Sequence, residues 1–139
     1  MNLNASVGLH FNGECEAAFK FYEQLLGGKI ELVLPWGASP LADQAPAGWG
    51  QKILFARLTT RGMALLGADA LPGTYQRPAG FSLTLSTTDP DEAEHLVAEL
   101  AKDGGTVKIP LAKTFWAHRY GFVTDRFGIP WEVNCAKAH

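Results

Sequence analysis

The sequence has few cysteines and no long apolar run, and both absences narrow its class. Cys15 and Cys135 are too few for a disulfide scaffold and fit a reducing compartment. No stretch approaches the ~20 apolar residues that a membrane-spanning helix needs. The first residues lack the basic and apolar regions of a secretory signal. We therefore expect a cytoplasmic protein without a membrane partner, with both cysteines as small buried side chains.

The sequence also lacks a large excess of charge of either sign. The net charge is −2 and no cluster of lysines and arginines occurs, which argues against nucleic acid as a partner. Motifs of nucleotide-binding loops, α/β-hydrolases and zinc peptidases are absent. With 47% apolar residues, the composition is that of a folded globular protein. We predict a single domain spanning residues 1–139.

An internal repeat organises the chain. In each half, an alternating strand leads into an amphipathic helix, a Gly-Gly pair and a second strand closed by proline. The first copy comprises a strand over 7–11, a helix ended by Gly27, and a strand over 29–34 closed by Pro35. The second comprises an alternating run over 81–86, a helix with Asp89 as N-cap and Pro90 next, a Gly-Gly pair at Gly104, and a strand over 106–109 closed by Pro110.

Two further strand-like runs complete each half. They cover residues 52–59 and 63–66 in the first half, and 120–124 and 131–135 in the second. Each half therefore reads β-α-β-β-β, which predicts an α+β protein made of two modules, residues 1–73 and 74–139. One helix covers only one face of such a sheet, so the other face must line a cavity or pack on a partner sheet.

Residues 35–50 form the one long irregular stretch, and they include Trp36 and Trp49. Loops of this length are usually functional or disordered. Because two tryptophans favour packing on an apolar surface, this stretch is a candidate lid, with a plain surface loop as the alternative.

Two stretches of the sequence resemble PhnB-like proteins of the vicinal oxygen chelate superfamily, which includes glyoxalases, bleomycin-resistance proteins and dioxygenases. They are Phe11-Asn12-Gly13-Glu14-Cys15-Glu16-Ala17-Ala18-Phe19-Lys20-Phe21-Tyr22 and the aromatic-rich run from Thr114 to Trp131. With residues 68–72 between them, the resemblance covers essentially the whole chain. It implies paired βαβββ modules curled around a cup-shaped cavity, often completed in a homodimer.

The resemblance also implies a metal site in the superfamily's metal-dependent enzymes, ligated by His, Gln or Glu from strands of both modules. Glu132 matches the carboxylate ligand of the last strand. Ser82 stands at a usual histidine position, and Gly8 or Val7 stands at another. This set falls short of a metal site, so we predict no metal or other cofactor. In the alternative, Glu132 and His10 bind a divalent metal.

Polar and aromatic side chains at the expected cavity are the candidate site residues. Glu132 and His10 are candidate catalytic residues; the alternatives are a salt bridge from Glu132 to Arg119 or Arg126 and a simple hydrogen bond for His10. Candidate ligand-binding residues are Ser82, Thr84, Phe115, Trp116, His118 and Tyr120. The aromatic members could instead plug one end of the cup.

Two aspartates in the sequence lie beside glycine and proline and read as turn residues. Asp125 opens an Asp-Arg-Phe-Gly hairpin turn, and Asp69 precedes Leu-Pro-Gly. Neither residue is assigned a functional role.

These observations predict a small-molecule-binding protein of the glyoxalase/bleomycin-resistance type, which acts as a homodimer and lacks a complete metal site. Binding without chemistry needs only an aromatic-lined cavity and a few polar groups. The alternative is a metal-dependent lyase, isomerase or dioxygenase. A third class, an assembly or regulatory module with a vestigial cavity, also remains open, as does the identity of the ligand.

Overall fold

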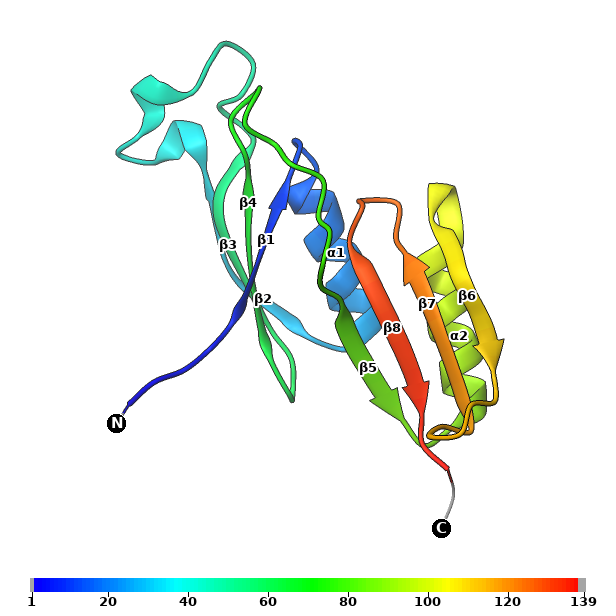
Figure 1. Ribbon diagram of the computed structural model, residues 1–139. Helices are drawn as coiled ribbons and strands as arrows, with labels where there is room; N and C mark the ends of the chain where they lie inside the picture. Colours follow the sequence, from blue (N-terminus) through cyan, green and yellow to red (C-terminus); the bar gives the residue numbers. More distant parts are fainter. Residues whose placement is uncertain (1, 138–139) are drawn as a thin grey trace. The chain divides into compact units, whose positions relative to one another are not determined.

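The computed structural model describes residues 2–137. These residues form two compact units, which meet between Gln76 and Arg77 in the sequence. Each unit contains a four-stranded mixed sheet and one α-helix in the order β-α-β-β-β (Figure 1). The predicted α+β class with a repeated module is confirmed. No helix among the described residues has the length and apolar character needed to cross a membrane.

The first unit pairs its strands in the order β1-β4-β3-β2, and only β1 and β4 run parallel. Its elements are β1 (Val7–Phe11), α1 (Cys15–Leu26), β2 (Lys29–Pro35), the short 3₁₀ turns η1 (Trp36–Ala38) and η2 (Ala42–Gln44), β3 (Ile53–Thr59) and β4 (Ala64–Asp69). A left-handed Gly27 ends α1, as the Gly-Gly pair predicts.

The second unit repeats this topology, with strand order β5-β8-β7-β6 and a parallel β5/β8 pair. Its elements are β5 (Leu83–Thr87), α2 (Pro90–Ala101), the 3₁₀ turn η3 (Lys102–Gly104), β6 (Thr106–Ala112), β7 (Arg119–Thr124) and β8 (Pro130–Cys135). Helix α2 begins at Pro90, and the Asp89 carboxylate accepts the Asp91 N–H at 2.9 Å, so the predicted cap is confirmed.

Each helix covers one face of its own sheet. In the first unit, Gly67 of β4 marks the contact, because a Cβ there would lie 2.5 Å from the Phe19 ring and 2.9 Å from Cys15 Sγ. In the second unit, the buried apolar face of α2 packs against the sheet side that carries Trp131 and Val133. We call the sheet face that the unit's own helix leaves uncovered the open face of that unit.

Three boundaries in the second half differ from the prediction. Strand β6 does not stop before Pro110 but continues to Ala112. It is an edge strand with a register shift between Ile109 and Ala112, and a proline is tolerated where no ladder hydrogen bond is required. Helix α2 ends at Ala101, before the Gly-Gly pair, and the exposed Phe81 lies outside β5.

Asp69 has a structural role that the turn interpretation missed. It is the buried last residue of β4, and its carboxylate accepts the backbone N–H groups of Cys15 at 2.9 Å and Ile53 at 2.8 Å. Residue Glu14 at the start of α1 makes no capping hydrogen bond, so Asp69 caps this helix from a distant strand. Cys15 is buried and free, and burial raises the pKa of its thiol far above the usual value.

The loop that follows β2 packs within the first unit. The indole N–H of the buried Trp36 donates to the Asp69 carbonyl oxygen at 3.2 Å. The Lys52 ammonium lies 5.9 Å from the centre of the Trp49 ring and donates to the Gly13 carbonyl at 2.9 Å. Both tryptophans therefore hold the loop against the end of β4 and the turn before α1. The lid hypothesis stays a prediction.

Candidate functional site

Glu132 lies in the middle of β8 on the open face of the second unit. Its strand neighbours Trp131 and Val133 are fully buried on the helix side, so strand alternation turns Glu132 to the other side. The buried Asp125 fixes this orientation, because its carboxylate accepts the Trp131 indole N–H at 2.9 Å. Within the sheet, Glu132 pairs with Thr84 on β5 and with Phe122 on β7.

Three hydroxyl groups surround the Glu132 carboxylate. The Tyr120 hydroxyl donates to Oε1, and the Thr84 hydroxyl donates to Oε2 at 3.1 Å. The Tyr120 hydrogen bond lowers the pKa of Glu132, and Ser82 and Thr84 add to this effect against partial desolvation. The same hydrogen bond raises the pKa of Tyr120 to about 12. Glu132 is therefore an anion and Tyr120 a neutral donor at physiological pH.

The two arginines considered as salt-bridge partners of Glu132 are engaged elsewhere. Arg119 Nη1 donates to the His118 carbonyl oxygen at 2.8 Å, and the Arg126 guanidinium lies 4.5 Å from the centre of the Phe127 ring. Hydroxyls rather than arginines therefore hold the Glu132 carboxylate. A carboxylate with a lowered pKa is a weak base but a good acceptor for a ligand's N–H or O–H group.

Aromatic side chains continue from Tyr120 onto the exposed surface. The Trp116 ring lies 5.3 Å from the Tyr120 ring, and the Phe115 ring lies 4.8 Å from the Trp116 ring, both in edge-to-face geometry. Trp116 is 50% exposed and Phe115 is 87% exposed, so neither fills the core of its unit. His118, the residue before β7 in the sequence, is half-buried. In the second unit, Tyr120 thus lies beside Glu132, and ring contacts continue from Tyr120 to Trp116 and Phe115.

His10 lies in the first unit, on the open face of its sheet. It is exposed on β1 and pairs with Ala68 on β4. A shallow pocket of about 210 Å³ adjoins it, and the lining is mostly apolar, with Phe55 and Leu66 as the largest members. Joint action of His10 with Glu132 stays a prediction.

The donor groups around Glu132 do not suit a transition metal. Among residues 2–137, no three His, Cys, Asp or Glu side chains gather closely enough to hold a metal ion. The neighbours of Glu132 are the hydroxyls of Tyr120, Thr84 and Ser82. Neutral hydroxyls are poor substitutes for the imidazole and carboxylate ligands of such sites, and the Tyr120 proton is held more firmly than usual.

Comparison with known proteins identifies the family. The sequence model of the Glyoxalase/Bleomycin resistance protein/Dioxygenase superfamily matches residues 9–133. Protein YjdN of Escherichia coli K12 is 31% identical over 137 residues, which cover 93% of this chain and 92% of YjdN.

Solved structures agree with this result. The crystal structure of protein PA1353 from Pseudomonas aeruginosa is 42% identical, with a TM-score of 0.84 over 97% of this chain and all of PA1353. A PhnB protein from Bacillus cereus, described as a putative 3-demethylubiquinone-9 3-methyltransferase, shares the fold at 20% identity and a TM-score of 0.81, with 96% of this chain and all of that protein covered. The chain therefore belongs to the Glyoxalase/Bleomycin resistance protein/Dioxygenase superfamily, as its sequence predicts.

Proposed function

We propose that this protein binds a small organic molecule on the open face of the second unit. The observation that carries the proposal is the Glu132 carboxylate, which hydroxyls hold as an anion on a sheet face beside exposed aromatic rings. A carboxylate has about four lone-pair positions for hydrogen bonds. Three hydroxyls leave about one position for an N–H or O–H group of a ligand, and Trp116 offers apolar contact area.

Binding is a better account of this site than proton abstraction. A general base that works near neutral pH needs a raised pKa, whereas the Tyr120 hydrogen bond lowers that of Glu132. The metal-dependent alternative gains no support from the donor set around this carboxylate. Ser82 and Thr84 act here as positioning residues that fix the carboxylate, while Trp116, Phe115 and His118 are the proposed contacts for the ligand body.

The experiment that tests this proposal is native mass spectrometry of freshly purified protein, followed by thermal-shift screening of small organic acids, amides and alcohols. We expect retained or added ligands to bind the wild type and to bind Glu132→Gln at least about tenfold more weakly, because the acceptor loses its charge. Glu94→Gln, on the exposed surface of α2, is the matched control. Equal ligand affinity of the wild type and Glu132→Gln would show that Glu132 is not part of the binding site.

We propose His10 as a second polar contact, to be tested in the same screen. Its exposed position beside a shallow apolar pocket supports a role in binding. Unchanged ligand affinity in His10→Ala would contradict that role.

We further propose that the protein is a cytoplasmic homodimer. Edge strand β2 exposes Leu32 and Val33, and apolar edge strands are normally paired or protected. Sedimentation velocity at micromolar concentration should give the mass of a dimer, and a monomer would contradict the proposal.

A further inference from the structure

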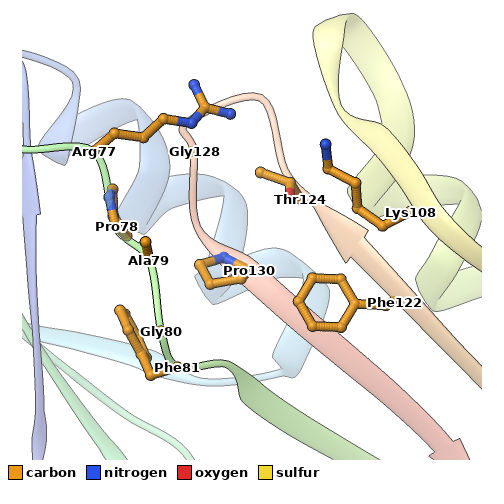
Figure 2. A pocket seen from close by; sticks show the side chains of 10 residues that line it. All are labelled: Arg77, Pro78, Ala79, Gly80, Phe81, Lys108, Phe122, Thr124, Gly128 and Pro130. Atoms are coloured by element: carbon orange, nitrogen blue, oxygen red, sulfur yellow. The ribbon is translucent and has the colours of Figure 1, made fainter.

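A second pocket of about 250 Å³ opens in the second unit, where the segment before β5 passes the beginning of β8 (Figure 2). Thr124 and Pro130, which are paired across β7 and β8, form part of its wall together with Phe122. These residues lie on the same sheet face as Glu132, because Phe122 is the direct partner of Glu132. The pocket therefore continues the open face on which the proposed binding site lies.

Two cationic side chains reach this pocket, and its lining contains no acidic residue. They are Arg77 from the segment before β5 and Lys108 from edge strand β6. Figure 2 shows both charged ends on the same side of the pocket, with the Thr124 hydroxyl between them in the view. Within the described part of the chain, no ion pair or hydrogen bond engages either cationic group. Their N–H groups are available to an anion.

The rest of the lining is apolar and flat. The Phe122 and Pro130 rings lie below the charged groups in Figure 2, and Phe81 closes another side. Phe81 is 42% exposed, so its ring offers further apolar area at the edge of the pocket. A ring or short apolar body fits such a lining, because aromatic contact requires area rather than hydrogen bonds.

We infer that this pocket binds the anionic end, a carboxylate or a phosphate, of a small molecule with a flat apolar body. The inference rests on the proposed function and names the ligand class for the same face. Arg77 and Lys108 would hold the anion, Thr124 would donate a further hydrogen bond, and the body would lie over Phe122, with its far end towards Tyr120 and Trp116.

Glu132 sets the orientation of this ligand. Successive strand residues are about 3.3 Å apart, so the Thr124/Pro130 pair and the Phe122/Glu132 pair are separated by about 7 Å. The negative carboxylate repels an anion and attracts a hydrogen-bond donor. A ligand with an anion at one end and an amino or hydroxyl group at the other therefore satisfies both positions.

The test uses benzoate, phenyl phosphate and 4-hydroxybenzoate as probes, with benzyl alcohol as the neutral comparison. Each is titrated by calorimetry and by amide chemical-shift perturbation into the wild type, Arg77→Gln, Lys108→Gln and the control Arg61→Gln, an exposed arginine of the first unit. We expect the charged probes to bind the wild type, each pocket variant to bind at least about tenfold more weakly, and Arg61→Gln to be unchanged. Amide spectra of the variants report whether the fold is intact.

The outcomes separate this inference from the proposed function. If benzoate and phenyl phosphate bind the wild type more tightly than benzyl alcohol does, the inference is supported. The tighter-binding of the two then identifies the anion as a carboxylate or a phosphate. Absence of charged-probe binding to the wild type, or equal binding by Arg77→Gln, Lys108→Gln and the wild type, overturns the anion pocket. If ligands from the wider screen still bind in a Glu132-dependent manner, the proposed function stands without it. If neither the probes nor the screen yields binding, both fall.

Discussion

Tyr120 donates its phenolic hydrogen to Glu132 diagonally across two neighbouring strands. The direct strand partner of Tyr120 is Asn134, and the direct partner of Glu132 is Phe122. Diagonal neighbours in a sheet are within reach of long and aromatic side chains. The contact links the exposed aromatic side chains to the Glu132 carboxylate. We therefore expect a ligand that binds to the aromatic rings to change the environment of Glu132.

The first prediction concerns the high-pH titration of Tyr120. Its pKa is raised from 10 to about 12, so its contribution to stability is fully present below pH 10 and is lost as pH rises through about 12. Ultraviolet titration of the tyrosines should show one group ionising well above 10, and this group should be absent in Tyr120→Phe. In Glu132→Gln it should ionise nearer 10, and an unchanged high value there would contradict the assigned cause.

The second prediction concerns the acid side of the same pair. The Tyr120 hydrogen bond lowers the pKa of Glu132 below 4.5, so its stabilising effect is present above pH 4.5 and is lost as pH falls through the lowered value. Carbon-detected NMR titration of the side chain should show a higher pKa in Tyr120→Phe than in the wild type. Trp116→Phe leaves the Tyr120 hydroxyl in place and is the control, in which the pKa of Glu132 should change little.

The third prediction compares two helix caps. Asp69→Ala leaves two buried backbone N–H groups without acceptors, and each such group costs about 1–3 kcal/mol, so we expect a loss of about 2–6 kcal/mol in the free energy of unfolding. Asp89→Ala removes the exposed cap of α2 and should cost about 1 kcal/mol. Urea unfolding of both variants measures the difference, and equal losses would argue against the long-range cap.

The fourth prediction compares two glycines of the first unit. An alanine at Gly67 would place a Cβ 2.5 Å from the Phe19 ring, and overpacking of this kind typically costs about 1–3 kcal/mol. A Cβ at Gly8 would meet nothing within 4 Å, so Gly8→Ala should change stability by less than about 1 kcal/mol. Thermal unfolding of the two variants provides the measurement. If Gly8→Ala destabilised the protein more than Gly67→Ala, contact with helix α1 would not be the reason for a glycine at position 67.

Local patterns predicted most of the fold. Alternating apolar residues identified β1, Asp89 and Pro90 located the start of α2, and Gly27 located the end of α1. The prediction that the strand ends before Pro110 was wrong, because the sequence does not reveal that β6 is an edge strand, on which a proline costs little. Strand order is a property of the whole sheet and cannot be read from one segment.

The surroundings of Glu132 could be derived from the sequence in part. Alternation around Trp131 and Val133 predicted that Glu132 faces away from the helix, and alternation in the strand before α2 predicted the same for Thr84. The structure places the two side chains on the open face and in contact. The hydroxyl shell could not be derived, because Tyr120 reaches Glu132 diagonally rather than as its direct partner. Asp69 was missed for a similar reason: its partners are distant in sequence, and the Leu-Pro-Gly that follows it is a strong local signal for a turn.

We expect the two helix caps to give the repeated modules different folding kinetics. Helix α2 carries its cap on the preceding residue, Asp89, so the capping hydrogen bond of its first turn needs no contact with a distant strand. Helix α1 receives its cap from a residue 54 positions later, so its first turn stays incomplete until β4 has joined the sheet. Amide exchange at the start of α1 will therefore report the closure of the whole first unit, whereas exchange at the start of α2 will report local fraying.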